Sequence, residues 1–585
     1  MEVFMKVEKM ICVWVAIVLT SFFFGCSNVF DPETNREEID PTKTQLYIGN
    51  VNQGFGEDWL QYGIKPRFEE FYKDTHFEEG KTGVQLVINE TDYGTALISK
   101  ISGDTNEIYF TESVAYYQFV NADKLLDITD AVTTPLTEYG EERSILDKMN
   151  TDAAKYFDTD DTENGRQFQA IPFYETYFTI IYNADLFAQE SLYLTTSGSG
   201  AWNNPLSWTS DVNAPNISPG PDGDIGTTFD NGLPATYDEF FQLCEKAKQS
   251  GLIPLSWNGA SGSYPGNFLM NLTANASGYD EMMLNYSFDG VSKTLVDSVN
   301  YDNDTHTGTL QMGDALDIEL SNGYELSRQA GKYYALEFFD RVLKGGYYNT
   351  TYLGNSTVSH IEAQNAFIRT AEFGGNSNGK DTAMLIDGTW WMNEAKNTFN
   401  SLVGVYGEKA GTMQRNFALM PLPMPRADFE RPGETGTQSV FLDKHMSACF
   451  INANIAPHKI DLAKKLLRFC HTDESIVEFT RYTNTIKPYS YDHTEADLEG
   501  FTPYARSVIT LKQHSKTVPA YSKSKIYVND ASGLTNPSNF WAKEGQNAPE
   551  AGLAPSGGET AKTYFEGMIT YNSKTYWDSK YKLYY

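Results

Sequence analysis

The sequence predicts an α/β fold in which a largely parallel sheet is interleaved with helices. Strand-like segments that alternate with helical ones near the start of the folded body indicate this class. Strands are expected at 44–50 (TQLYIGN), 82–90 (TGVQLVINE) and 106–110 (NEIYF). Between them, 57–74 and 93–103 carry apolar residues at helical spacing.

A capped helix followed by a further strand is expected near the middle of the chain. Thr236 stands at the N-cap, Glu239 completes a capping box three residues later, and Gly251 closes the helix. The apolar run 252–257 (LIPLSW) is the strand that follows. Other helices are expected around 324–344, around 358–369 and within 461–483, whereas the tail past about 490 predicts no particular element.

The first 25 residues have the features of an export signal. Lys6 and Lys9 precede an apolar stretch over 10–24 that is short for a membrane span. The following FFGC resembles a bacterial lipobox, in which Cys26 is lipidated, although Phe replaces the usual Leu and small residue. A plain signal peptide or an anchor helix is the alternative. Residues 26–43 are polar and acidic and predict a flexible tether.

Charge and cysteine content exclude some classes of function. The net charge of −32 would repel nucleic acid and anionic headgroups. No stretch after the signal is apolar enough to span a bilayer. Cys244, Cys449 and Cys470 match no metal motif and are expected to be buried free thiols rather than a disulfide framework.

Several motifs in a fixed order carry a family resemblance. They are QGFGEDWL (53–60), AIPFYETYFTIIYNADLF (170–187), TAMLIDGTWW (382–391), FALMPLPMP (417–425) and MSACFINANIAPHKIDLAKKLLRFC (446–470). In this order the chain resembles bacterial extracellular solute-binding proteins (family 1) of carbohydrate ABC transporters, which include maltodextrin-binding proteins. The resemblance covers most of 44–490. A Gly-, Pro- and Ser-rich insertion at 193–233 and the tail depart from the smaller members.

The resemblance implies a type II periplasmic-binding-protein-like fold: two α/β lobes with a ligand cleft between them. The family pattern has the chain cross between the lobes near 171–175, 384–387 and 441–447. The implied boundaries are 44–170 plus 384–440 for lobe I and 173–383 plus 445–585 for lobe II.

Trp390 is the first candidate for a ligand contact. In the maltodextrin-binding pattern, a tryptophan just after the strand AMxIxG lies against a sugar ring, and Trp390 matches that position. An indole covers the apolar C–H face of a pyranose with little conformational freedom to lose. Adjacent residues cannot both point into one core, so Trp391 is expected to pack inward. The alternative is that both rings cover a lobe edge.

Three further segments supply aromatic and amide candidates. Trp257 and Asn258 follow the strand 252–257, with Tyr264 nearby. Core packing is the alternative for Trp257, whereas the Asn258 side chain both donates to and accepts from hydroxyl groups. Phe55 lies between Gly54 and Gly56, which permit a tight turn that exposes it.

Carboxylates are the strongest acceptors for paired sugar hydroxyls. Glu112 follows the strand 106–110, Glu175 interrupts an apolar run beside a crossing, and Asp387 ends the strand before Trp390. Tyr174 and Thr111 are weaker candidates of the same kind. The alternative for each of the three carboxylates is that it is only a solvated surface residue.

A loop at 218–234 is a candidate structural calcium site, since Asp222, Asp224 and Asp230 offer oxygen ligands among glycines. The glutamate of an EF-hand is missing, and Asp-Gly clusters also form ordinary turns.

The function implied by the resemblance is binding without catalysis. A monomer tethered to the extracellular face of the bacterial cell membrane by lipid (palmitate) on Cys26 would capture a carbohydrate and deliver it to ABC permease transmembrane subunits. No cofactor would be required and no nucleic acid bound. The aromatic content of 14% favours an oligosaccharide. The alternatives are a secreted polysaccharide-acting enzyme, for which no catalytic motif is found, and a carbohydrate-binding surface protein without transport.

Overall fold

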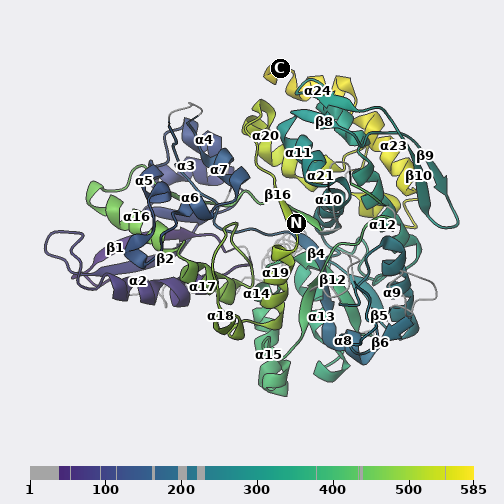
Figure 1. Ribbon diagram of the computed structural model, residues 1–585, viewed down its shortest axis with the longest axis horizontal. Coiled ribbons are helices and arrows are strands. Elements are labelled where there is room, and N and C mark those ends of the chain that lie inside the picture. The colour runs from purple at the N-terminus through teal and green to yellow at the C-terminus, as the bar shows by residue number, and fades with distance from the viewer. Residues whose placement is uncertain are drawn as a thin grey trace, which may run out of the picture.

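The protein consists of two lobes of unequal size that lie side by side (Figure 1). The structure is a computed structural model. It describes residues 38–52, 54–92, 94–113, 115–160, 165–195, 207–219, 231–376, 379–427, 429–431, 434, 439–546 and 548–585.

Lobe I is built on a four-stranded sheet of order β15-β3-β1-β2. Its strands are β1 (Thr44–Asn50), β2 (Val84–Glu90), β3 (Ile108–Thr111) and β15 (Ala448–Ile451). β1 pairs in parallel with β2 and β3, and β15 runs antiparallel to β3. The helices are the π-helix η1 (Trp59–Ile64), α2 (Lys65–Phe71), α3 (Thr95–Lys100), α4 (Tyr116–Asn121), α5 (Thr129–Thr133), α6 (Ile145–Lys148), α7 (Thr151–Phe157), α16 (Ile460–Phe469) and α17 (Asp473–Thr483).

Lobe II is built on a second four-stranded sheet of order β13-β4-β12-β7. Its strands are β4 (Phe178–Asn183), β7 (Ile253–Ser256), β12 (Thr382–Gly388) and β13 (Phe417–Met420). Smaller pairs are β5 (Tyr193–Thr195) with β6 (Ser207–Thr209), β8 (Gly290–Ser292) with β11 (Leu316–Ile318), β9 (Val296–Asp302) with β10 (Thr307–Met312), and β14 (Val440–Asp443) with β16 (Lys516–Pro519).

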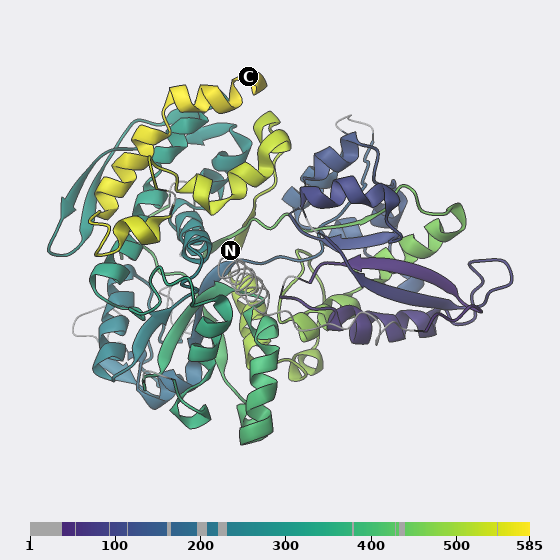
Figure 2. The ribbon, with the colours of Figure 1, turned by 180° about the vertical axis from the view of Figure 1, so that it is seen from behind.

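The helices of lobe II surround this sheet and form a second layer toward the C-terminus, which is seen from behind in Figure 2. They are α8 (Ala184–Gln189), α9 (Tyr237–Gln249), α10 (Ser263–Ser277), α11 (Tyr279–Ser287), α12 (Ala330–Lys344), α13 (His360–Ile368), α14 (Trp391–Glu394), α15 (Lys396–Tyr406), α19 (Pro503–Gln513), α20 (Lys525–Thr535), α21 (Pro537–Phe540), α22 (Pro549–Leu553), α23 (Ala561–Tyr571) and α24 (Lys574–Tyr581).

Local signals explain where these elements begin and end. The Thr236 hydroxyl accepts from the Glu239 amide at 3.3 Å, so the predicted N-cap of α9 is confirmed. The Glu239 carboxylate, however, accepts from the amide of Ala235 at 2.8 Å, one residue before the N-cap, so the predicted capping box is wrong. Gly251 closes the turn after α9 with a φ of +83°.

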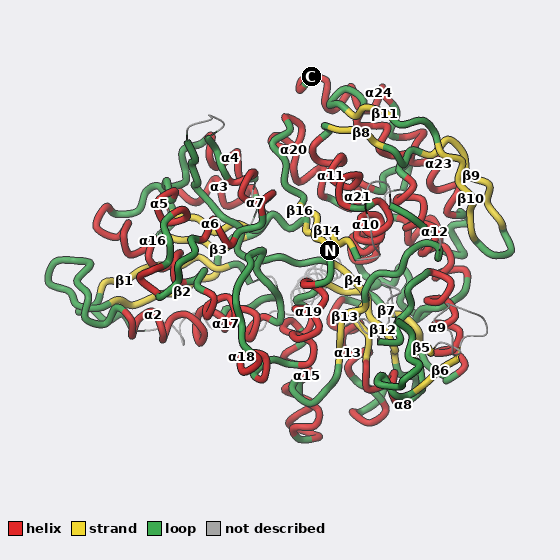
Figure 3. The backbone as a smooth tube through the Cα atoms, viewed as in Figure 1, coloured by secondary structure: helices red, strands yellow, loops and turns green. Residues whose placement is uncertain are grey.

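The chain crosses between the lobes at 172–177, 444–447 and 484–502, mostly as loops, as Figure 3 shows. The third crossing also holds the short helix α18 (Glu495–Glu499). The crossings are hydrogen-bonded to one another. The Ser447 hydroxyl donates to the Tyr174 carbonyl at 2.9 Å, and the Glu175 amide donates to the Ile486 carbonyl at 2.9 Å.

The structure corrects two of the expected lobe boundaries. No crossing occurs at 384–387, because β12 lies inside the sheet of lobe II, parallel to β7 and antiparallel to β4. The strand β13 also pairs with β4, so 384–440 belongs to lobe II and not to lobe I. Conversely, β15 pairs with β3, and α17 packs on η1, so 448–483 belongs to lobe I.

Other expectations concern the insertion, the tail and the cysteines. The insertion 193–233 contains the β5–β6 hairpin, and the tail contributes β16 and the helices from α19 onward. Cys244, Cys449 and Cys470 are buried and free, as expected. Among the described residues, no helix is long and apolar enough to cross a membrane.

An ion pair ties the first crossing to lobe II. The Glu175 carboxylate, 2% exposed, accepts from the Lys512 amine at 2.6 and 2.7 Å and from the Thr517 hydroxyl at 2.7 Å. Such a carboxylate is costly to bury without its cation.

Lys512→Met should therefore lower the free energy of unfolding by about 2 kcal/mol, since a charged hydrogen-bonded partner is lost from a buried acid. Urea unfolding followed by circular dichroism measures this. Lys73→Met is the matched control, because Lys73 pairs with Glu70 on the exposed surface and its loss should leave the free energy of unfolding nearly unchanged. An equal decrease in the free energy of unfolding for both variants would contradict a stabilising role of the Glu175–Lys512 ion pair.

Candidate functional site

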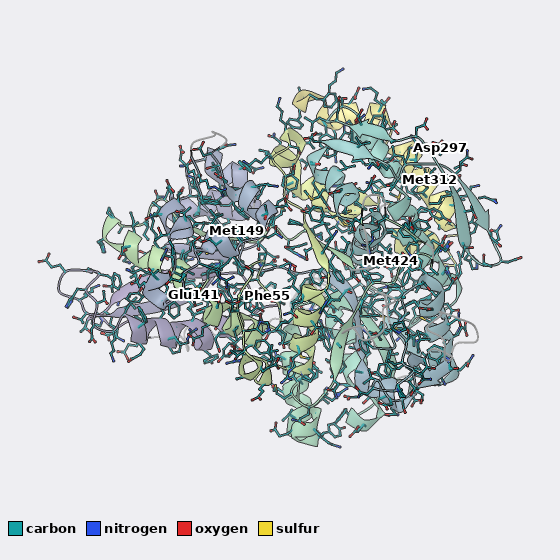
Figure 4. All side chains as sticks on the ribbon, in the orientation of Figure 1. Phe55, Glu141, Met149, Asp297, Met312 and Met424 are labelled. Carbon is teal, nitrogen blue, oxygen red and sulfur yellow. The ribbon has the colours of Figure 1, made fainter. Side chains whose placement is uncertain are left out.

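Aromatic side chains from both lobes meet where the chain crosses between them. We call this group the boundary cluster: Phe55, Tyr174, Phe178, Trp390 and His445. The ring centroids of Phe55 and Tyr174 are 4.4 Å apart. Trp390 meets Phe178 at 5.1 Å and His445 at 5.3 Å, both edge-on. Phe55, labelled in Figure 4, comes from lobe I. Phe178 begins β4 and Trp390 directly precedes α14, both in lobe II.

The Trp390 ring is held between two glycines of different lobes. A Cβ on Gly388 would overlap the six-membered ring, and a Cβ on Gly54 would lie 2.5 Å from Cδ1. Trp390 is partly buried, whereas Trp391 is fully buried, so the expected inward packing of Trp391 is confirmed. Trp390 thus fills a space between the lobes that exists only because both neighbours lack side chains.

The loop that carries Phe55 is fastened to lobe II. Gly54 and Gly56 have φ values of +80° and +69°, which glycine adopts without strain. The expected exposure of Phe55 is wrong, because its ring packs against Tyr174 and is 2% exposed. The Asn393 amide donates to the carbonyls of Gly54 at 2.8 Å and Phe55 at 2.6 Å. Lys396 forms an ion pair with Asp58. These contacts place the 54–58 loop of lobe I directly on α14 and α15.

Glu112 contacts the boundary cluster through Tyr174, and its pKa is strongly raised. It is 8% exposed, and its carboxylate accepts from the Tyr174 hydroxyl. Burial raises the pKa of Glu112 to about 7, opposed by the Tyr174 hydrogen bond and the charge of Lys444. Burial also lowers the pKa of Lys444 to about 8. Both charges are therefore easily neutralised near neutral pH.

His445 supplies a neutral imidazole to the cluster. Burial lowers its pKa to about 3, and the charge of Lys444 acts in the same direction. Its Nδ1 lies 2.9 Å from the Thr176 hydroxyl. The ring therefore offers an uncharged, partly apolar surface between the first and second crossings.

An acidic group adjoins the cluster on lobe II. The Gln364 amide donates to Asp387 at 3.2 Å and to Glu394 at 2.5 Å. Burial and the nearby Glu394 raise the pKa of Asp387 well above its usual range. Tyr264 packs edge-on against Phe178 at 5.4 Å and stacks on His360 at 6.3 Å, which joins this group to the cluster.

The structure brings six of the ten predicted ligand residues together: Phe55, Glu112, Tyr174, Tyr264, Asp387 and Trp390. Trp257 lies instead in the core of lobe II. Its Nε1 donates to Glu550 at 2.9 Å, and its ring stacks on Tyr348 at 5.3 Å. The Asn258 carbonyl oxygen accepts from the Ala260 amide at 3.0 Å, so it closes a local turn.

Two more predicted residues have structural partners away from the cluster. The Thr111 hydroxyl is fully buried and donates to the Asp92 carbonyl at 3.2 Å. Glu175 is taken up by Lys512 and Thr517 as described above. Neighbouring side chains of an extended chain point to opposite sides, so Glu175 points away from the cluster when Tyr174 points into it.

Four participants were not predicted: Phe178, His445, Gln364 and Glu394. His445 lies inside the second expected crossing, 441–447, and that placement was an available signal. Glu394 follows Trp390 by one helical turn, a spacing that places the two on one face. For Phe178 and Gln364 the sequence holds no comparable signal.

The candidate calcium ligands Asp222, Asp224 and Asp230 lie outside the described residues. Within the described part of the chain, no group of three or more His, Cys, Asp or Glu side chains could hold a metal ion.

Many solved structures are similar to this chain. No family model matches the sequence, and no curated protein matches it. A chitin oligosaccharide binding protein superposes with a TM-score of 0.48 at 14% identity, over 92% of this chain and 100% of that chain.

Replacing Glu112 by Gln should change how stability depends on pH. The raised pKa stabilises the folded protein below pH 4.5, and that contribution is lost as the pH rises to about 7. The free energy of unfolding of Glu112→Gln should equal that of the wild type near pH 4.5. Above pH 7 it should be larger than that of the wild type by about 3 kcal/mol. Chemical denaturation across this range tests it, with the exposed Glu79→Gln as control. A difference that does not vary with pH would contradict the raised pKa.

Gly54→Ala should displace Trp390, because the added Cβ would overlap its indole. A shift of tryptophan emission to longer wavelength, as the ring gains solvent contact, is the expected result. Gly56→Ala is the matched control. It imposes the same backbone strain, but its Cβ would meet only the Asn393 amide, at 3.5 Å. Identical emission from both variants would mean that the Gly54 contact does not hold the ring.

Proposed function

We propose that this protein is a carbohydrate-binding receptor that captures its sugar between the two lobes. The observation that supports this most is the boundary cluster, because its rings come from both lobes and from two crossings. A ligand held there touches both lobes at once and therefore favours the closed arrangement over the open one. The loops at 172–177 and 444–447 are the segments that would bend.

The chemistry of the cluster suits a sugar. Trp390 and Phe55 offer large flat apolar surfaces, and sugars present a matching face of C–H groups. Glu112, Asp387 and Glu394 supply acceptors for hydroxyl groups at its edge. The aromatic content of 14% favours an oligosaccharide over a single sugar.

Access to Trp390 requires the lobes to separate. Its ring is packed against Gly54 of lobe I and against Phe178 and His445. A sugar would reach the indole face only after the 54–58 loop has moved away from α14. The contacts of Asn393 and Lys396 with that loop would then be broken and re-formed in each binding cycle.

The remaining parts of the proposal follow from the expected export signal, the family resemblance and the acidic loop at 218–234. Lipid on Cys26 would hold the protein, as a monomer, on the extracellular face of the bacterial cell membrane. There it would deliver sugar to ABC permease transmembrane subunits without a cofactor. A structural calcium at Asp222, Asp224 and Asp230 is part of this proposal, and loss of thermal stability on adding a chelator would support it.

A polysaccharide-acting enzyme is the second candidate, because of the Asp387–Glu394 pair. A carboxyl group with a raised pKa, such as Asp387, beside a second carboxyl group is the pairing that glycosidic bond cleavage requires. Release of reducing ends from oligosaccharides, abolished by Asp387→Asn, would favour this candidate over the receptor.

Calorimetric titration with mono-, di- and oligosaccharides tests the receptor. We expect one-to-one binding without product, weakened roughly tenfold or more by Trp390→Ala, which removes the stacking surface. Trp208→Ala, in the distant β6 strand, is the control for loss of an indole. Absence of binding to every sugar would overturn the proposed ligand class, and equal binding by both variants would move the site away from Trp390.

A further inference from the structure

A cavity of about 90 Å³ lies in lobe II, away from the boundary cluster. Its walls come from α12, α21, α24 and the 3₁₀ helix η5 (Gly323–Arg328). The end of lobe II that carries α24 and the C-terminus is at the top of Figure 1. A space of this size admits a molecule of a few heavy atoms. The exposed side chains of Asn539 and Lys580 mark its mouth.

A buried lysine reaches this cavity without a polar partner. Lys332, in the first turn of α12, is 6% exposed. Its Nζ lies 4.1 Å from the centroid of the Phe540 ring. Among the described residues, no side chain or carbonyl forms a hydrogen bond or ion pair with this Lys332 amine. Lys148 shows the usual arrangement, since its buried amine pairs with Glu141 at 2.7 Å and with Asp473 at 2.6 Å.

The cavity is positively lined in a strongly acidic protein. The chain has 77 acidic and 45 basic residues, yet the cavity lining contains Lys332 and Lys580 and no Asp or Glu. A randomly chosen set of residues from this acidic chain would more often carry a net negative charge. The missing counter-charge is therefore a property of this place and not of the chain.

The Phe540 ring does not compensate for burial of the Lys332 amine. A cation–π contact contributes about 0.5–2 kcal/mol, whereas burying an ammonium costs several kcal/mol. In agreement, burial lowers the pKa of Lys332 to about 7. A negatively charged molecule in the cavity would supply both the missing charge and the missing acceptors.

We propose that this cavity binds a small oxyanion, the carboxylate or phosphate group of a molecule of a few heavy atoms. The Lys332 amine donates to it at the floor, and Lys580 attracts it at the mouth. Phe540 and Trp577 cover its apolar part. This site is separate from the proposed sugar site, so a failed test of one proposal leaves the other unaffected.

Binding should weaken as the pH rises above 7, because the anion selects the charged form of Lys332. For a carboxylate that stays ionised across this range, affinity is constant below the pKa of the free amine and falls about tenfold per pH unit above it. The other titratable groups that face the cavity are Lys580, Tyr576 and Tyr581 on α24, and Tyr324 on η5. Two carboxylates contact these groups: Asp530 accepts from the Tyr581 hydroxyl at 2.9 Å, and Glu325 accepts from the Tyr324 hydroxyl.

The test is calorimetric titration of the full chain with sodium phosphate and, separately, sodium acetate at pH 6 and constant ionic strength. Lys332→Met keeps the length of the side chain and removes the charge. Lys344→Met removes a lysine from the same helix that does not line the cavity. We expect the wild type and Lys344→Met to bind one of the two anions, and Lys332→Met to bind it at least tenfold more weakly. Tighter binding of phosphate or of acetate shows whether the site takes a phosphate or a carboxylate group.

A second readout covers the case in which Lys332→Met fails to fold. Trace acetylation with acetic anhydride, read by mass spectrometry, should modify Lys332 in the wild type and be suppressed by the bound anion. Binding of neither anion, equal binding by Lys332→Met, or unchanged acetylation in the presence of both anions would overturn the proposal.

Discussion

The molecule depends on three crossing segments that are held side by side by buried hydrogen bonds. Ser447 in the second crossing bonds to Tyr174 in the first, and Glu175 bonds to Ile486 in the third. The sheet of lobe I takes β15 from beyond two crossings, and β14 of lobe II pairs with β16 from beyond the third, so both pairings require these segments to stay together. The position of the boundary cluster follows from the same constraint.

The crossings also explain why charged groups are buried at the lobe boundary. A crossing segment leaves one sheet before it reaches the next, so side chains must satisfy its backbone groups. Asp443 accepts from the backbone amide of His445, whereas Glu112 and Glu175 accept from side chains of neighbouring segments. Burial raises the pKa of Glu112 and Asp443. Polar groups needed for the architecture thus become available for ligand contacts.

Much of the fold was predictable from periodicity and capping residues. The strands of lobe I and the helix after Thr236 lie where local pattern places them, and adjacent Trp390 and Trp391 divide between boundary and core. The lobe boundaries were not predictable, because β12 has the same continuous apolar pattern whether it crosses or pairs within a sheet. Trp257 was misplaced for a related reason: its partner Glu550 lies in a tail that carries no readable pattern.

The pairing of β15 with β3 constrains how the protein is made. Thr111 leaves the ribosome long before Ala448, its partner in the sheet of lobe I. At synthesis rates of about 5–20 residues per second, the first part of lobe I waits tens of seconds for its last strand. Lobe II, which lies mostly between these two segments, is largely synthesised in that interval. During this time the edge of β3 is an unpaired strand, so the growing chain would benefit from a holdase until Ala448 emerges.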